Sequence, residues 1–129
     1  MSDGFWRGLF VVAAMFNVAA GLPPLVAPEQ ALETFGMAPL PDHLFMRVTG
    51  LLVLTLGVGY WFVSRNLNLR EIVWLGVIGK SGVVVLFAWS WMRGLVSSTA
   101  AAAGMGDLLF VIGFLSFLAT HRPNSAKPA

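Results

Sequence analysis

The sequence predicts an all-α, polytopic membrane protein: a bundle of four transmembrane helices with a short interfacial helix between helices 1 and 2. Of its 129 residues, 57% are hydrophobic and only 11% are charged, whereas a soluble domain normally carries about 25% charged residues. Crossing a hydrocarbon core of roughly 30 Å takes ~20 apolar residues. Segments of about this length cover residues 5–22, 44–64, 71–92 and 100–120. Because the connections between them are short, residues 1–129 are predicted to form a single membrane domain.

The first apolar segment has some features of a secretory signal peptide, namely Arg7, an apolar core and the small residues at 19–21. Asn17 interrupts that core and three further spans follow, which favours a membrane-spanning helix instead. We expect Pro23 and Pro24 to end this helix, because proline lacks an amide hydrogen and clashes with the preceding turn.

The connection from Pro23 to His43 is the longest polar segment of the chain. Within it, Pro28 and Glu29 are typical of a helix start, since proline fits the first turn and an acid favours the positive helix end. Gly36 is a natural stop. The apolar residues between them predict an amphipathic helix over Pro28–Phe35 that lies on the membrane surface.

The remaining connections are short turns, Arg65–Arg70 and Arg93–Ser98, and the tail at 121–129 is rich in polar residues and proline and is predicted to fray. In the second span Gly50 and Gly57 lie seven residues apart, on one helix face. Small residues at helical spacing let backbones approach closely, so this face is predicted to contact another helix.

Basic residues set the predicted orientation. With four spans, one side of the membrane receives Arg7, Arg65, Arg70, Arg122 and Lys127. The other side receives Arg47 and Arg93 together with three acidic residues of the first connection. Because lysine and arginine favour the cytoplasmic side, both termini are predicted to be cytoplasmic.

Lys80 lies near the middle of the third span, where an ammonium facing lipid would be costly. It lies nine residues after Glu71, roughly 13 Å along the helix. Asp107 and Arg47 enter the bundle from the other side, and Asn17 interrupts the first span. The candidate ligand-binding residues are therefore Lys80, Asp107, Arg47 and Asn17.

This polar constellation has three possible interpretations. Lys80 and Asp107 could neutralise one another and only fix the register of two helices. Alternatively Arg47 and Lys80 outnumber Asp107, and the surplus positive charge would receive a lipid phosphate, a carboxylate or a quinone-like carbonyl. A proton relay is a third possibility, with a single central acid.

The sequence lacks the residues that several kinds of catalysis and cofactor binding require. The chain has no cysteine, which excludes disulfides, thiol catalysis and iron–sulfur clusters. His43 and His121 are predicted at opposite ends of the bundle, so they cannot share a haem or a metal ion. No G-x-S-x-G motif is present, and the basic residues form no patch for nucleic acid. We expect no metal, no cofactor and no catalytic residue.

Several short strings resemble the DoxX-like small four-helix bacterial membrane proteins: Val26-Ala27-Pro28-Glu29, Arg47-Val48-Thr49-Gly50, Leu75-Gly76-Val77-Ile78-Gly79-Lys80 and Gly106-Asp107-Leu108-Leu109-Phe110. The resemblance implies a multi-pass protein of the bacterial inner membrane. It also implies that Arg47, Lys80 and Asp107 are pattern positions of the family. Members that give the family its name are linked to quinone-dependent sulfur oxidation, and no catalytic role carries over to this cysteine-free chain.

Three functions are consistent with these features. The first is a non-catalytic accessory or self-associating subunit that binds a lipid- or quinone-like head group near the Lys80 cluster. The others are a small proton-coupled transporter, and a membrane enzyme that uses Lys80 and Asp107 as acid–base groups on a lipid or quinone. Expected partners are membrane lipids, a quinone or small amphiphile, and a homo-oligomer or larger membrane complex, but not nucleic acid.

Overall fold

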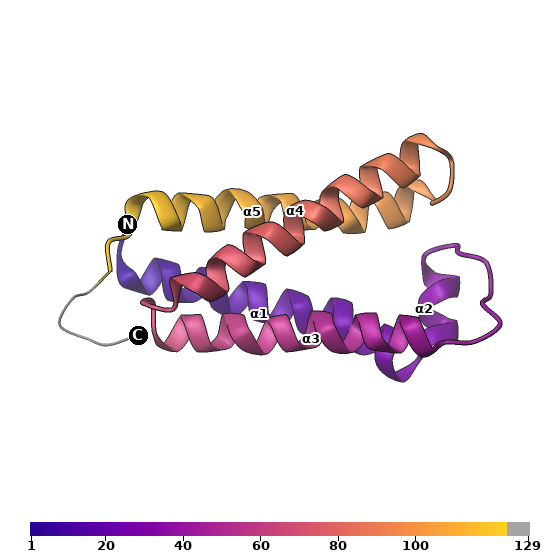
Figure 1. Ribbon diagram of the computed structural model, residues 1–129, viewed down its shortest axis with the longest axis horizontal. Coiled ribbons are helices and arrows are strands. Elements are labelled where there is room, and N and C mark those ends of the chain that lie inside the picture. Colours follow the sequence, from indigo (N-terminus) through magenta and orange to yellow (C-terminus); the bar gives the residue numbers. More distant parts are fainter. Residues whose placement is uncertain (124–129) are drawn as a thin grey trace.

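The computed structural model describes residues 1–123, and within this part all regular structure is helical (Figure 1). The helices are α1 (Asp3–Val26), α2 (Pro28–Thr34), α3 (Leu44–Arg65), α4 (Arg70–Met92) and α5 (Ser98–Thr120). All except the short α2 are long and apolar enough to cross a membrane. The predicted four-helix membrane bundle with a short helix after the first span is confirmed.

The prediction that Pro23 and Pro24 end the first helix is wrong, because α1 continues through both prolines to Val26. Membrane helices tolerate proline in their interior, and beyond the two prolines other groups satisfy the carbonyls at the end of α1. Here the Ala27 amide donates to the Pro23 carbonyl at 2.8 Å, and Arg47 Nη1 donates to the Leu25 carbonyl at 2.8 Å. The last turn of α1 therefore remains helical.

The long helices form two pairs: α1 packs mainly on α3, and α4 packs mainly on α5 (Figure 1). Both the start of α1 and the end of α5 lie at one end of the bundle, which we call the termini end; α2 lies at the opposite α2 end. The two pairs meet in a core rich in aromatic residues, whose largest fully buried members are Trp6, Phe10, Tyr60, Val63, Val73, Phe114 and Phe117.

At the α2 end, the connection that contains α2 meets the connection between α4 and α5. Ala31 and Leu32 are buried, and Gly36 has a φ of +64°, which ends the helix in a left-handed conformation that glycine adopts readily. Ser97, in the connection between α4 and α5, donates its hydroxyl hydrogen to the Phe35 carbonyl at 2.9 Å. The first and third connections are thereby joined.

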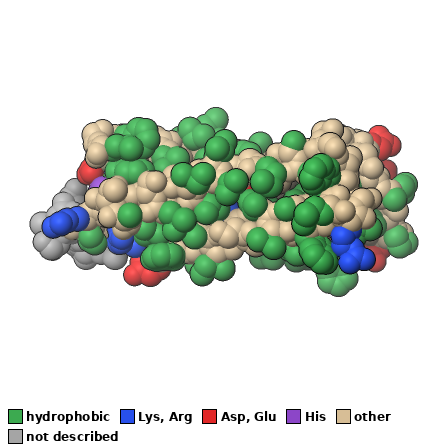
Figure 2. Space-filling model, turned by 90° about the horizontal axis from the view of Figure 1, so that it is seen from above, with side chains coloured by type: hydrophobic (Ala, Val, Ile, Leu, Met, Phe, Trp, Pro, Cys, Tyr) green, Lys and Arg blue, Asp and Glu red, His purple; other side chains and the backbone are tan. Residues whose placement is uncertain are grey.

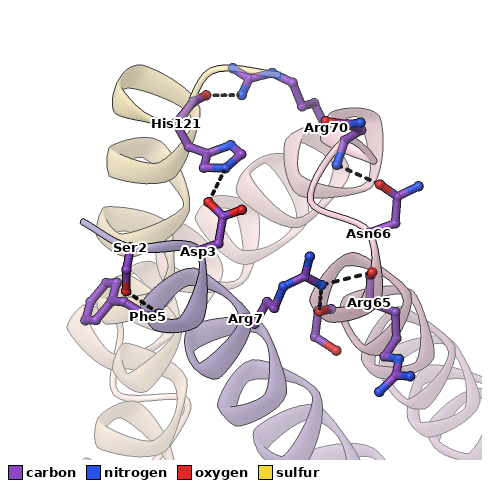
Figure 3. Close-up of polar contacts among 10 residues, drawn as sticks. Ser2, Asp3, Phe5, Arg7, Arg65, Asn66, Arg70 and His121 are labelled. Atoms are coloured by element: carbon purple, nitrogen blue, oxygen red, sulfur yellow. Dashed lines mark hydrogen bonds and ion pairs between the residues drawn. The ribbon is translucent and has the colours of Figure 1, made fainter. Parts of the chain in front are cut away.

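At the termini end, arginine side chains hold the ends of α3 and α5 (Figure 3). Arg7 Nη1 donates to the carbonyls of Ser64 and Arg65 at 2.7 and 2.9 Å. Arg70 donates to the carbonyls of Leu118 and His121. The last carbonyls of a helix lack partners within it, so these bonds cap both helices.

His121 begins the segment that was predicted to fray, yet it is anchored. Its Nε2 lies 3.1 Å from Asp3 Oδ1, and its ring stacks on Phe117 at a centroid distance of 4.8 Å. Residues 124–129, the rest of that segment, lie outside the described residues.

The surface of the bundle has the polarity of a membrane protein. Figure 2 shows hydrophobic side chains spread over the middle of one long face, with most of the charged side chains gathered at the two ends. Large hydrophobic side chains are exposed along all the long helices. Such a surface is expected to face lipid over the length of the bundle.

Candidate functional site

Lys80 occupies the centre of the bundle and is only 5% exposed. Its ammonium donates to Asn17 Oδ1 at 2.9 Å and to Asp107 Oδ1 at 2.5 Å. One side chain of α4 is therefore bonded to both α1 and α5. These distances place the ammonium inside the protein, away from lipid.

Aromatic rings cover the rest of the ammonium. Lys80 Nζ lies 5.0 Å from the ring centroid of Phe110, 5.1 Å from that of Phe16 and 5.6 Å from that of Tyr60. A cation within about 6 Å of a ring face is attracted by the ring quadrupole. Two hydrogen bonds and three rings thus surround the ammonium. We call the set formed by Lys80, Asn17, Asp107 and these three rings the Lys80 cluster.

Asn17 extends the cluster to the remaining long helix. Its Nδ2 donates to the Val53 carbonyl in α3 at 3.0 Å, while its Oδ1 accepts from Lys80. Because a side-chain amide has both a donor and an acceptor group, one residue of α1 can bridge α3 and α4. The cluster therefore links all the membrane-spanning helices.

Arg47 does not join the Lys80 cluster. It is exposed at the α2 end, where it bonds to the Leu25 carbonyl. Leu25 lies eight residues after Asn17 in α1, which is roughly 12 Å along a helix. The predicted surplus of positive charge from Arg47 and Lys80 together is therefore absent, and the lysine faces one carboxylate.

Asp107 is the member of the pair that is less enclosed, with 13% of its side chain exposed against 6% for Lys80. Its second oxygen makes no hydrogen bond within residues 1–123, so it is free to accept one. Tyr60 is fully buried, and its hydroxyl has no hydrogen-bond partner in the described part of the chain. The cluster retains an open acceptor at Asp107 and an unbonded phenol nearby.

Sequence reasoning missed the aromatic members of the cluster. Phe110 lies three residues after Asp107, on the same helix face, so that spacing could have identified it. Phe16 and Tyr60 resemble many lipid-facing aromatic residues of the spans, and no local pattern distinguishes them. Within residues 1–123, no three metal-ligating side chains come together.

Replacing Asn17 by leucine tests whether the amide matters to the cluster. The variant removes one hydrogen bond to the Lys80 ammonium and one to Val53, so we expect a loss of about 1–2 kcal/mol in unfolding free energy. Unfolding in SDS, followed by tryptophan fluorescence, measures the change.

Thr55→Val is the matched control for Asn17→Leu. The Thr55 hydroxyl is exposed and bonds only to the Leu51 carbonyl of its own helix, so its loss should change stability by less than about 0.5 kcal/mol. Equal effects of the two substitutions would contradict a special role for Asn17.

The fold and the cluster define the class of this protein: a multi-pass integral membrane protein whose spanning helices are joined by a buried ion pair. No protein-family model, curated protein or solved structure matches the chain.

Proposed function

We propose that this chain is a non-catalytic integral protein of the bacterial inner membrane, an accessory or self-associating subunit that binds a lipid- or quinone-like amphiphile at the Lys80 cluster. One observation carries the proposal: the Lys80 ammonium is held by Asn17, Asp107 and three rings. A lysine fixed in this way acts as part of the packing rather than as a mobile acid or base.

The state of Asp107 suggests which head group would fit. Its carboxylate is already paired with Lys80 and has an open acceptor oxygen, and Arg47 contributes no charge to the cluster. A neutral head group with a hydroxyl donor, such as that of a quinol, complements this site better than an anion does. The phosphate and carboxylate ligands expected from the sequence are therefore the weaker candidates.

Membership in the DoxX-like family and cytoplasmic termini are part of the same proposal. The order of the elements, with a short helix between the first two spans, agrees with the architecture that the resemblance implies. The arginines at the termini end, Arg7, Arg65 and Arg70, support the cytoplasmic orientation.

Native mass spectrometry of the protein extracted in mild detergent tests this function, with added short-chain ubiquinol as the probe. We expect an oligomer or a complex with another subunit that retains ubiquinol. The double variant Lys80→Met/Asp107→Leu, which removes both charges together, should keep the assembly and lose the ubiquinol. A bare monomer without bound amphiphile would overturn the proposal.

A small proton-coupled transporter is the second candidate, and the partial exposure of Asp107 favours it. An acid inside a membrane span that is not fully enclosed is a feature that a proton carrier needs. Proteoliposomes loaded with a pH-sensitive dye would show proton movement driven by a cationic test substrate such as ethidium. The same double variant should abolish that movement, and equal movement in both proteins would reject transport.

A further inference from the structure

An apolar groove runs along the outside of the α1–α3 pair. It has a volume of about 680 Å³ and extends over α1 from Val11 to Pro23 and over α3 from Gly57 to Trp61. Its floor is made of small residues, Ala14 and Gly57, which are both buried. We call this hollow the α1–α3 groove.

The groove has the dimensions of one lipid chain. Val11 and Pro23 are twelve residues apart, which is roughly 18 Å along a helix. One leaflet contributes about half of the ~30 Å hydrocarbon core. Because the whole groove lies within spanning helices, acyl chains of the surrounding lipid are what it meets in the membrane.

Two guanidinium groups mark the end of the α1–α3 groove near the termini. Arg65 lies one turn beyond Trp61 in α3, with its guanidinium carbon 6.0 Å from the Trp61 ring centroid. Arg7 lies one turn before Val11 in α1 and is bonded through Nη1 to the Ser64 and Arg65 carbonyls. This end of the groove, which we call its mouth, is therefore positively charged.

No acidic side chain forms an ion pair with Arg7 or Arg65 within the described residues. The ion pairs found within residues 1–123 are Lys80–Asp107 and His121–Asp3, and neither includes an arginine. Gly8, on α1 between Arg7 and the groove, has no atom within 4 Å of where a Cβ would lie, so space remains there. The surface of α1 beside Arg7 is therefore open.

We propose that the α1–α3 groove binds one anionic phospholipid, with an acyl chain along α1 and α3 and the phosphate on Arg65 and the free N–H groups of Arg7. Guanidinium groups bind phosphate through paired hydrogen bonds, and tryptophan is typical of the head-group depth. The site is separate from the Lys80 cluster, so it does not depend on the proposed function.

The charge at the mouth argues against a second copy of this chain as the occupant. Two copies related by a two-fold axis would present the same patch to each other. Their four arginine side chains would then lie near the interface, and neither Arg7 nor Arg65 has an ion-pair partner within the described residues. A lipid phosphate supplies the missing negative charge, and its acyl chain matches the apolar walls.

The test uses the full chain in mixed micelles containing equal amounts of phosphatidylglycerol and phosphatidylcholine. Native mass spectrometry should show one phosphatidylglycerol retained per chain in preference to phosphatidylcholine. Arg65→Gln should lower this preference roughly fivefold, because one basic group at the membrane surface is lost. Ala19→Phe, which fills the groove without changing charge, should lower the retention of both lipids.

Arg93→Gln is the matched control, since Arg93 also lies over a tryptophan, 5.6 Å from the Trp89 ring, but at the α2 end. It should leave the lipid preference unchanged. An equal effect of Arg93→Gln and Arg65→Gln would overturn the proposal, because the attraction would then be general. So would efficient disulfide cross-linking of Val58→Cys between two chains, which have no other cysteine.

Discussion

Lys80→Met is expected to destabilise the bundle by about 3–5 kcal/mol, because it removes one partner of a buried ion pair and leaves the other uncompensated. Asp107 would then lie in its partly buried position without a cation and without the hydrogen bond from Nζ. SDS titration followed by the emission of the five tryptophans measures the loss.

The double variant Lys80→Met/Asp107→Leu should recover most of this loss. Replacing both members of a buried pair by apolar residues of similar size is often neutral or stabilising, since two desolvation costs disappear together. The coupling energy from the double-mutant cycle separates the pair from other effects of each substitution. If the double variant were as unstable as the sum of the single variants, the pair would have no joint role.

Glu71→Gln provides the control for removing a charge from α4. Glu71 is exposed in the first turn of that helix, so its neutralisation should change stability by less than about 0.5 kcal/mol. A loss comparable with that of Lys80→Met would mean that the total charge, rather than the buried contact, sets the stability.

The sequence predicted that Lys80 faces the inside of the bundle and that Asp107 lies near its depth, but it left open whether the two pair. A helix rises by a fixed amount per residue, so the positions of Lys80 and Asp107 in their spans determine that the two can meet. The cost of a charge in lipid requires only that Lys80 turns away from lipid, and the structure shows that it bonds to Asp107. The structure adds that Asn17 also binds the ammonium, as the interruption of the first span suggested.

Arg47 shows where such reasoning fails. The sequence predicted which span contains Arg47 and at which end of the bundle it lies, but it did not predict the carbonyl that Arg47 binds. The chain was expected to leave the helix at Pro23, so the Leu25 carbonyl was not expected to be the unpaired end of α1 that Arg47 now caps. A long side chain at a helix end binds the nearest free acceptor, and that acceptor depends on tertiary structure.

Of the glycines at the contact between α1 and α3, the sequence predicted those of α3 but not their partner in α1. Gly50 and Gly57 were predicted to lie on a contact face, and both are buried against α1. Gly21 was noted only as part of a small-residue run, yet it lies directly opposite Gly50. Spacing within one helix identifies a face, but the partner on the other helix depends on how the two are shifted relative to each other.

Gly50→Ala is expected to cost about 3 kcal/mol or more, because no side chain can move to admit the methyl group. A Cβ on Gly50 would lie 2.5 Å from the Gly21 carbonyl oxygen and 2.9 Å from the Leu25 amide nitrogen. Both are backbone atoms of α1, so the helices themselves must separate. Thermal unfolding in detergent, followed by tryptophan fluorescence, measures the loss.

Gly82→Ala is the comparison for Gly50→Ala. Gly82 is also inside a spanning helix, but nothing lies within 4 Å of its added Cβ. Alanine there should be neutral or slightly stabilising, since glycine is a poorer helix former by about 0.5–1 kcal/mol. Similar losses at Gly50 and Gly82 would show that helix propensity, not the contact between α1 and α3, limits stability.

The double variant Gly21→Ala/Gly50→Ala tests the geometry further. A Cβ on Gly21 would lie 2.6 Å from the Gly50 carbonyl oxygen, so each glycine makes room for the backbone of the other. Once the first methyl group has forced α1 and α3 apart, the second enters space that is already open. The combined loss should therefore be clearly smaller than the sum of the single losses. Strict additivity would mean that the two glycines do not share one contact, and the close approach of α1 and α3 at this point would be contradicted.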